Sequence, residues 1–208
     1  MRPLALIFDF GGVLMDWDPR YLYRKVFDGN AQAMEAFLAE IDFPEWNRLQ
    51  DEGRPFAEAV EALSRQFPQY ADLIRLYDER WEESLRGPIH HTVEILQRLK
   101  EAGFPLYALS NWSLEKYRLV RPKHAFFNWF EQVLVSGEVK VTKPDSRIYK
   151  IFLERTGLSA GDCLFIDDSQ PNITVARQLG FQAVHFESPA KLEAQLQNMG
   201  FFQSVATG

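Results

Sequence analysis

One short stretch near the amino terminus restricts the fold of this chain more than any other. It reads Leu4-Ala-Leu-Ile-Phe-Asp-Phe-Gly-Gly-Val-Leu14, and it opens with an apolar run that is too short for a helix. Such a run is typical of a strand buried on both faces of a parallel sheet. Asp9, Gly11 and Gly12 follow, at the position where open α/β sheets bind ligands. Because Asp and Gly are also common in turns, the stretch alone is equally compatible with an ordinary turn.

The chain from Ile89 onward alternates between helical and strand-like patterns. Predicted strands cover residues 105–109, 132–135, 163–166 and 183–186, and predicted helices cover residues 91–102, 114–120, 146–156, 171–179 and 189–199. The helix that starts at Ser146 has Asp145 or Ser146 as its N-cap and Gly157 as its C-cap. Apolar strands separated by helices imply a parallel sheet that is covered on both faces.

A helical segment interrupts the first strand–helix unit. Between residues 20 and 86 apolar side chains recur at helical spacing, most clearly in residues 31–41, 56–67 and 73–85. Gly87-Pro88 ends the segment, and residues 15–19 are expected to be a linker. We therefore predict a doubly wound α/β core of residues 1–16 and 87–208, with residues 17–86 inserted as an all-helical cap subdomain.

Composition narrows the classes of partner and compartment. The net charge is −6 and no basic run occurs, so we expect no nucleic-acid partner. No apolar run approaches the ~20 residues that span a bilayer, so we expect no membrane partner. We do not expect the amino terminus to act as a signal peptide, because Asp9 interrupts its apolar run and no small-residue cleavage site follows. With Cys163 as its one cysteine, the chain is expected in the cytoplasm; its oligomeric state stays open.

Polar residues follow the strands at the edge where the carboxyl ends of parallel strands meet. They are Asp9, Ser110, Asn111, Lys143, Asp167 and Asp168. Several carboxylates in one crevice repel each other unless a cation neutralises them. Hard oxygen ligands without His or Cys favour Mg²⁺, which also takes phosphate oxygens from a substrate. A lysine and neighbouring hydrogen-bond donors can hold the same phosphoryl group.

The order of these residues resembles that of the haloacid dehalogenase superfamily of hydrolases, which are mostly phosphatases. Asp9-Phe-Gly-Gly-Val13, Leu109-Ser-Asn111, Lys143-Pro144 and Phe165-Ile-Asp-Asp168 are similar to its four motifs. The resemblance implies that Asp9 is a nucleophile that forms an aspartyl phosphate, and that Ser110 and Lys143 hold the phosphoryl group. It also implies that Mg²⁺ is bound by Asp9, by Asp168, by the Gly11 carbonyl, and by Asp167 directly or through water.

One position departs from the family pattern. Most phosphatases of the family carry a second Asp two residues after the nucleophile as general acid and base, and here Gly11 stands there. General acid–base catalysis contributes typically about 10²–10⁴-fold. A subgroup that resembles sugar-1-phosphate phosphatases shares this feature, which makes a small sugar phosphate a candidate substrate. Asp16 or Asp18 is a candidate replacement, although we favour reading both as solvated linker carboxylates.

Two other functions remain open. A 2-haloacid dehalogenase of the same family also lacks the second Asp, works without metal and shares the spacing of Lys143 and Tyr149. We favour the phosphatase, because Asp167 and Asp168 without a metal would repel an anionic haloacid. The third reading is a catalytically silent binding module on the same fold, which the missing Asp at Gly11 suggests.

Further residues have both a structural and a functional interpretation. Asn172 either orients the carboxylates or is an ordinary surface residue. Trp112 and Tyr149 are interpreted as core residues, Cys163 as a packed thiol, and His90 and His91 as the start of a helix without metal-ligand spacing. The remaining set forms either a cap face towards the substrate or an exposed stretch between helices: Trp46, Asn47, Asp51 and Arg54.

Overall fold

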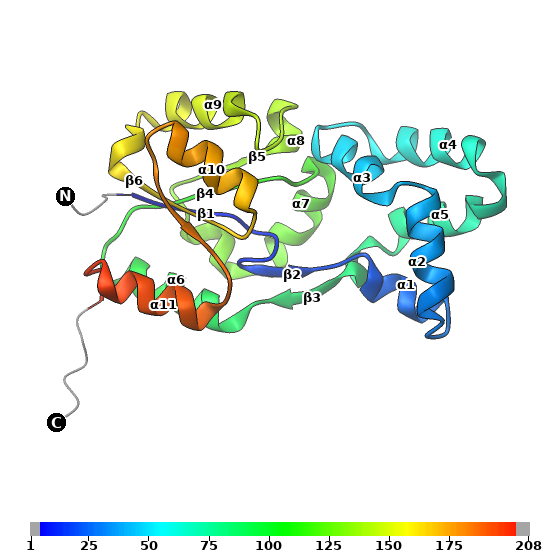
Figure 1. Ribbon diagram of the computed structural model, residues 1–208, viewed down its shortest axis with the longest axis horizontal. Coiled ribbons are helices and arrows are strands. Elements are labelled where there is room, and N and C mark those ends of the chain that lie inside the picture. Colours follow the sequence, from blue (N-terminus) through cyan, green and yellow to red (C-terminus); the bar gives the residue numbers. More distant parts are fainter. Residues whose placement is uncertain (1–4, 203–208) are drawn as a thin grey trace.

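The computed structural model describes residues 5–202 and contains a parallel sheet at its centre (Figure 1). Within these residues the sheet has five strands in the order β5-β4-β1-β6-β7. All neighbouring strands pair in parallel, with Phe8 of β1 opposite Ala108 of β4 and Ile166 of β6. The strands are β1 (Ala5–Phe8), β4 (Leu106–Ser110), β5 (Gln132–Val135), β6 (Cys163–Asp167) and β7 (Gln182–His185).

Alternation along β1 explains why helices cover both faces of the sheet. Leu6 and Phe8 belong to the apolar cluster that includes α6 (His90–Glu101) and α11 (Pro189–Asn198). Ala5 and Ile7 point to the other face, where α9 (Ser146–Thr156) and α10 (Gln170–Gln178) pack (Figure 1). All four residues are at most 1% exposed, so the strand is buried on both sides. The predicted doubly wound sheet is therefore confirmed.

A separate group of helices lies beyond one end of the sheet (Figure 1). We call residues 20–84 the helical insertion; its helices are α1 (Arg20–Val26), α2 (Ala31–Glu40), α3 (Phe43–Asp51), α4 (Phe56–Gln66) and α5 (Ala71–Glu79). Their inner faces meet around Tyr77, whose ring stacks on Tyr23 at 6.0 Å between centroids and meets Phe43 edge-on at 5.0 Å. The helical character of the segment agrees with the prediction, and its domain boundaries stay a prediction.

A two-stranded antiparallel ribbon joins the insertion to the core. It pairs β2 (Met15–Trp17) with β3 (Leu85–Pro88), and Trp17 lies opposite Leu85. The prediction that residues 15–19 form a linker, and that residues 73–85 form one helix, was wrong here. The helix α5 ends at Glu79, and a 3₁₀ turn at Trp81–Ser84 leads into β3. Such short strands exist because two distant segments pair, and neither segment carries a local period that would reveal it.

The remaining elements of the core follow the predicted order. Within the described residues α7 (Leu114–Val120), β5 and α9 have the predicted bounds, and the other predicted core elements differ by one or two residues at their ends. Asp145 caps α9 by accepting a hydrogen bond from the Arg147 N–H, and Gly157 ends it with a φ of 68°. The predicted first residue of β1, Leu4, lies outside the described residues. A short helix, α8 (Ser136–Val139), was not predicted.

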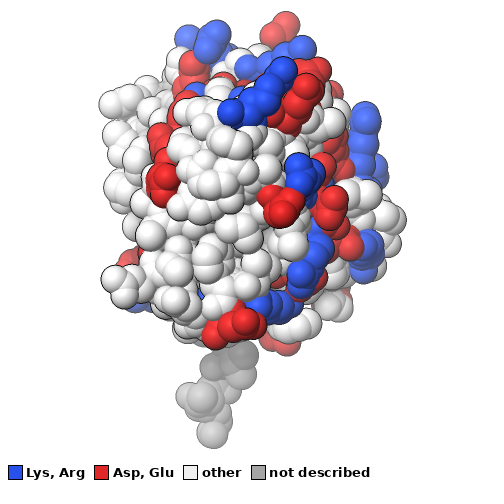
Figure 2. Space-filling view, turned by 90° about the vertical axis from the view of Figure 1, so that its right-hand side faces the viewer, with Lys and Arg blue, Asp and Glu red and all other residues white. Residues whose placement is uncertain are grey.

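Charges on the outer end of the insertion are mixed in sign. Figure 2 shows basic and acidic side chains interspersed on this face. Ion pairs within the insertion include Arg20 with Glu35 at 2.6 Å and Arg80 with Glu83 at 2.6 Å. This face therefore presents no single-sign field of the kind that attracts nucleic acid. Among residues 5–202 no helix has the length and apolar character required to cross a bilayer.

Candidate active site

The edge of the sheet brings together four of the predicted site residues. Asp9 follows β1, Asp167 and Asp168 lie at the end of β6, and carboxylate oxygens of all three lie within 4.8 Å of one another. Lys143 reaches the same point from the loop before α9, and its Nζ is 2.9 Å from Asp9 Oδ2 and 2.7 Å from Asp167 Oδ2. Residues far apart in sequence therefore form one cluster of three carboxyl groups and one ammonium group.

Lys143 is fixed by its side chain and by its main chain. Its Nζ donates a third hydrogen bond to the Leu109 carbonyl at 2.9 Å, and the residue is only 3% exposed. Asn111 holds the main chain of Lys143 by accepting from its N–H at 2.8 Å and donating to its carbonyl at 2.9 Å. Burial lowers the pKa of Lys143, but the carboxylates of Asp167 and Asp9 outweigh this effect and raise the pKa above its usual value. The side chain is therefore a permanent positive charge.

Asp167 is oriented by donors from the protein. Besides Lys143, it accepts hydrogen bonds from the Ser169 N–H at 2.8 Å and from Asn172 Nδ2 at 3.0 and 3.1 Å. Asn172 is 6% exposed, so the structure supports its orienting role over that of a surface residue. Tyr149 is a core residue, as predicted, and its hydroxyl donates to the Asn172 carbonyl at 3.1 Å. Asp167 is thus held in place by hydrogen bonds from the protein itself.

Asp9 and Asp168 are the carboxyl groups with fewer partners. Asp9 accepts from the Phe10 N–H at 2.7 Å, and burial raises its pKa to about 7, with Lys143 acting in the opposite direction. Burial also raises the pKa of Asp168, and the Asp167 charge adds to that effect. Asp9 shares the charge of Lys143 with Asp167, and the exposed Asp168 forms no ion pair within the described residues, so three carboxyl groups face one positive charge. A cation bound between Asp9 and Asp168 would supply further positive charge.

Ser110 offers an unused donor beside this cluster. The residue is 1% exposed, and its hydroxyl makes no hydrogen bond of normal geometry within the described residues, although it lowers the pKa of Asp9 from nearby. A buried hydroxyl without a partner costs free energy, about 1–3 kcal/mol, unless a ligand satisfies it. The donor set of carboxylate oxygens fits Mg²⁺, and the free hydroxyl fits an oxygen-rich anion such as a phosphoryl group.

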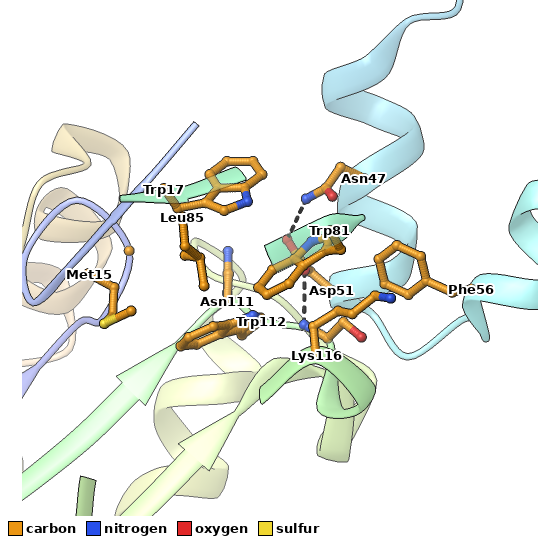
Figure 3. A pocket seen from close by; sticks show the side chains of 12 residues that line it. Met15, Trp17, Asn47, Asp51, Phe56, Trp81, Leu85, Asn111, Trp112 and Lys116 are labelled. Atoms are coloured by element: carbon orange, nitrogen blue, oxygen red, sulfur yellow. Dashed lines mark hydrogen bonds between the residues drawn. The ribbon is translucent and has the colours of Figure 1, made fainter. Parts of the chain in front are cut away.

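A pocket opens from this edge towards the helical insertion (Figure 3). Its volume is about 70 Å³, which is room for roughly five water molecules or a small organic group. Gly11 and Asn111 line its core side, and Asn47 and Asp51 of α3 line the side of the insertion. The other lining residues are mostly aromatic or apolar: Met15, Trp17, Phe56, Trp81, Leu85, Trp112, Ser113 and Lys116.

The lining of the pocket shows which residues of the insertion face a possible substrate and which have a structural role. Asn47 and Asp51 do face it, whereas Trp46 is buried in the insertion and donates from Nε1 to the Ala59 carbonyl at 3.3 Å. Arg54 instead donates to Gln50 Oε1 at 2.7 Å. Trp112 is 8% exposed and belongs to the core cluster, as predicted, but one side of it also lines the pocket.

The sequence analysis did not identify several walls of the pocket. Trp17 belongs to β2 and Trp81 to the turn before β3. Both line the pocket only because the ribbon brings their segments together. Lys116 is almost buried, pairs with Asp78, and lies 4.3 Å from the Phe56 ring centroid. The positions of two tryptophans at opposite ends of the insertion are the one sequence signal that could have suggested a shared wall.

Other predicted candidates lie outside the site. Asp16 accepts from the Tyr21 hydroxyl at 2.7 Å, and Asp18 accepts from the Arg20 N–H at 2.8 Å, and neither lines the pocket. These local partners support a structural role for both, although Asp16 lies in β2 and not in a linker as predicted. His91 pairs with Glu193 on the surface at 3.1 Å, and Cys163 is a buried free thiol, as expected.

The sequence of the chain matches a family model and several characterised proteins. A family model described as haloacid dehalogenase-like hydrolase matches residues 3–180. The chain is 27% identical over 201 residues to the drimenol cyclase drtB of Aspergillus calidoustus. The matched region covers 94% of this chain but only 36% of that protein. It is 24% identical over 181 residues to the sesquiterpene phosphatase astK of Aspergillus oryzae, with 87% and 88% coverage.

The chain is also similar to dehalogenases and to solved structures of the family. The (S)-2-haloacid dehalogenase of Pseudomonas putida is 34% identical over 95 residues, which are 45% of this chain and 41% of that protein. A solved structure of the HAD family enzyme bt-2542 from Bacteroides thetaiotaomicron, in complex with magnesium and inorganic phosphate, superimposes with a TM-score of 0.67. That protein is 25% identical, and the match covers 90% of this chain and 98% of the other.

Proposed function

The chain belongs to the haloacid dehalogenase-like hydrolases, and from this we propose that it is a Mg²⁺-dependent phosphatase that hydrolyses a small phosphomonoester through an aspartyl phosphate on Asp9. One observation carries the proposal. Three carboxyl groups have oxygens within 4.8 Å of one another, the buried Lys143 pairs with two of them, and the unpartnered hydroxyl of Ser110 lies beside them. This arrangement lacks positive charge and has a free donor, and a divalent cation with a phosphoryl group supplies what is missing on both counts.

The residues that hold Mg²⁺ in this proposal are Asp9, Asp168 and the Gly11 carbonyl, with Asp167 acting directly or through water. Mg²⁺ held by these residues would supply positive charge against the phosphoryl oxygens, so that a carboxylate can approach phosphorus. Asp167 has four hydrogen bonds from Lys143, Ser169 and Asn172, which suits a position behind the direct ligands.

In the proposed reaction Asp9, Lys143 and Ser110 each have a separate role. An ionised oxygen of Asp9 attacks phosphorus, and the bond to the ester oxygen breaks with its electron pair on the leaving group. Lys143 favours the ionised form of Asp9 because its Nζ lies 2.9 Å from Asp9 Oδ2. The Ser110 hydroxyl donates to the transferred group. Water then attacks the aspartyl phosphate, which releases inorganic phosphate and restores Asp9.

The substrate in this proposal is a small phosphorylated metabolite, with sugar phosphates as one class. The pocket supports a small leaving group, since its volume is about 70 Å³. Its aromatic walls suit the apolar face of a sugar ring, of a benzylic group or of a short isoprenoid. The matched sesquiterpene phosphatase makes isoprenoid phosphates a second class worth testing. Residues 17–86 would act as the cap that selects among these groups.

A 2-haloacid dehalogenase is the second candidate, and the partial similarity to (S)-2-haloacid dehalogenases is the observation in its favour. The charge of the site argues against it. Asp167 and Asp168 lie beside Asp9, and within the described residues Lys143 is the one lysine or arginine that pairs with this cluster, so an anionic haloacid would be repelled in the absence of a metal.

A panel of phosphorylated metabolites, assayed for inorganic phosphate with Mg²⁺ and with a chelator, tests the proposal. We expect turnover that requires Mg²⁺ and falls to background in Asp9→Asn, because an amide cannot act as the nucleophile. Asp16→Asn is a matched control on the ribbon that should retain the activity. Full activity in Asp9→Asn, or halide release from 2-chloropropionate in the presence of chelator, would contradict the phosphatase. Absence of turnover across the panel, without Mg²⁺ binding, would favour a silent binding module.

A further inference from the structure

The proposed reaction leaves one proton unassigned. An alcohol is a poor leaving group unless its oxygen is protonated as the bond to phosphorus breaks. The residue two positions after Asp9 is Gly11, and a side chain there would meet no atom within 4 Å, so the space in front of it is open. Asp16 and Asp18 are occupied by Tyr21 and Arg20 outside the pocket. The donor must therefore come from another wall of the pocket.

Asp51 is a carboxyl group on the wall that faces Gly11 and Asn111 (Figure 3). It lies at the last turn of α3, and its Oδ1 accepts a hydrogen bond from the Ser113 N–H at 3.0 Å. Asn47, one turn earlier on the same helix, donates to Oδ2 at 3.1 Å. The bond from Ser113 ties the carboxyl group to the loop after β4, the strand that ends with Ser110, and the bond from Asn47 orients it on α3.

The surroundings of Asp51 favour a retained proton. Burial raises its pKa to about 7, the Ser113 N–H lowers the pKa in part, and the charges of Asp9 and Glu52 raise it. A share of the molecules therefore carries the proton at neutral pH.

The other charged side chain that lines the pocket is Lys116 of α7, and its charge is offset by its ion pair with Asp78. Tyr77 of α5 lies near Asp51, and Glu115 of α7 accepts from the Phe56 N–H at 3.4 Å. The helix α8, whose Ser136 donates to the Asp51 carbonyl, carries Glu138 in an ion pair with Arg155.

We propose that Asp51, carried by the helical insertion, is the general acid that protonates the leaving oxygen, in place of the carboxylate that Gly11 lacks. This assignment rests on the proposed phosphatase function. In the first step Asp9 attacks phosphorus, the phosphorus–oxygen bond breaks, and the Asp51 proton moves to the departing oxygen. In the second step the Asp51 carboxylate takes a proton from the water that attacks the aspartyl phosphate. Ester and water are consumed, alcohol and phosphate are formed, and both carboxyl groups return to their starting state.

Two esters of similar size separate acid catalysis from a structural role. Benzyl phosphate releases an alkoxide that needs a proton, whereas 4-nitrophenyl phosphate releases a stable phenolate that does not. We expect Asp51→Asn to lower kcat/KM for benzyl phosphate by about 10²–10⁴-fold and to change that for 4-nitrophenyl phosphate only a few-fold. The ratio kcat/KM is the appropriate measure, because it ends with departure of the leaving group and excludes hydrolysis of the common intermediate.

The pH profile provides the second readout. Ionisation of Asp9 gives a rising limb with both esters, whereas with benzyl phosphate kcat/KM of the wild-type chain should fall again as the pH rises beyond about 7, because the protonated form of Asp51 is lost. That decrease should be absent in Asp51→Asn and with 4-nitrophenyl phosphate. Glu45→Gln removes a carboxylate from the first turn of the same helix, far from Asp51, and should leave the ratio of the two kcat/KM values unchanged.

Each remaining outcome overturns a defined part of the argument. Equal losses for both esters in Asp51→Asn would show that the residue only anchors α3 to the loop after β4, and would overturn its role as acid while leaving the phosphatase intact. Unchanged rates for both esters in Asp51→Asn would also overturn the role of Asp51 as acid and leave the phosphatase intact. A wild-type chain that hydrolyses neither ester, nor any member of the metabolite panel, would overturn the proposed function and the role of Asp51 with it.

Discussion

Gly12 and Asp168 show how closely the side chains of the site pack against the main chain. Gly12 has a φ of +69°, and a Cβ placed on it would lie 2.1 Å from Asp168 Oδ2. Only a residue without a side chain allows this approach. The carboxylate of Asp168 is thereby placed against the turn that follows Asp9, which is how two strand ends contribute to one cluster.

We expect Gly12→Ala to abolish Mg²⁺ binding and phosphatase activity, because the new methyl group displaces Asp168 and the positive φ adds strain of about 1 kcal/mol or more. Calorimetric titration with Mg²⁺ measures the loss. Gly161→Ala is the control, since a Cβ there would meet nothing within 4 Å. Wild-type Mg²⁺ affinity in Gly12→Ala would show that Asp168 is not a ligand.

The helical insertion depends on an aromatic cluster rather than on helix propensity. Its helices are short, with 7 residues in α1 and 9 in α3, and isolated helices of this length are marginal in water. Packing around Tyr77 and Phe37 therefore stabilises them, with Phe37 5.0 Å from the Tyr23 ring. Only when this segment folds does α3 present Asp51 to the pocket.

Leu22 of α1 is fully buried at 0% exposure, whereas Leu119 of α7 is 51% exposed. We expect Leu22→Ala to lower the free energy of unfolding by about 2–5 kcal/mol, and Leu119→Ala to change it by less than about 0.5 kcal/mol. Chemical denaturation monitored by circular dichroism measures both. Similar values for the two variants would mean that the insertion does not pack as described.

At the scale of the whole molecule, the site joins segments that the chain keeps apart. The turn after β1, the end of β6 and the loop carrying Lys143 meet at the edge of the sheet, and the insertion closes over it through Asp51 and Ser113. The unbalanced carboxylates of Asp9 and Asp168 oppose this arrangement, because burial raises the pKa of each. A bound cation should therefore stabilise the fold as well as assist the reaction.

We expect Mg²⁺ at a hundredfold excess over its Kd to stabilise the folded chain by about 2.7 kcal/mol, which raises the Tm. Differential scanning calorimetry with and without Mg²⁺ measures the shift. Asp168→Asn should lose most of it, while Asp145→Asn, at the exposed N-cap of α9, should keep it. An equal shift in wild type and Asp168→Asn would place the cation elsewhere.

The core could be predicted from sequence because its signals are local. A buried strand such as β1 shows as an apolar run, α9 shows its caps, and the order of strands and helices implies which ends share an edge. That edge rule predicts from the sequence alone that Asp9, Lys143 and Asp168 lie together, as they do in the structure.

Only the tertiary structure decided the ribbon, the pocket and the partners of each polar group. The strands β2 and β3 exist by pairing with each other, and Trp17 and Trp81 share a wall only after that pairing. Asn111 binds the main chain of Lys143, a contact that its position after a strand does not reveal. Asp51 gains its raised pKa from burial between α3 and the loop after β4. Local periodicity records which face of an element is buried, whereas solvation and hydrogen-bond partners depend on segments distant along the chain.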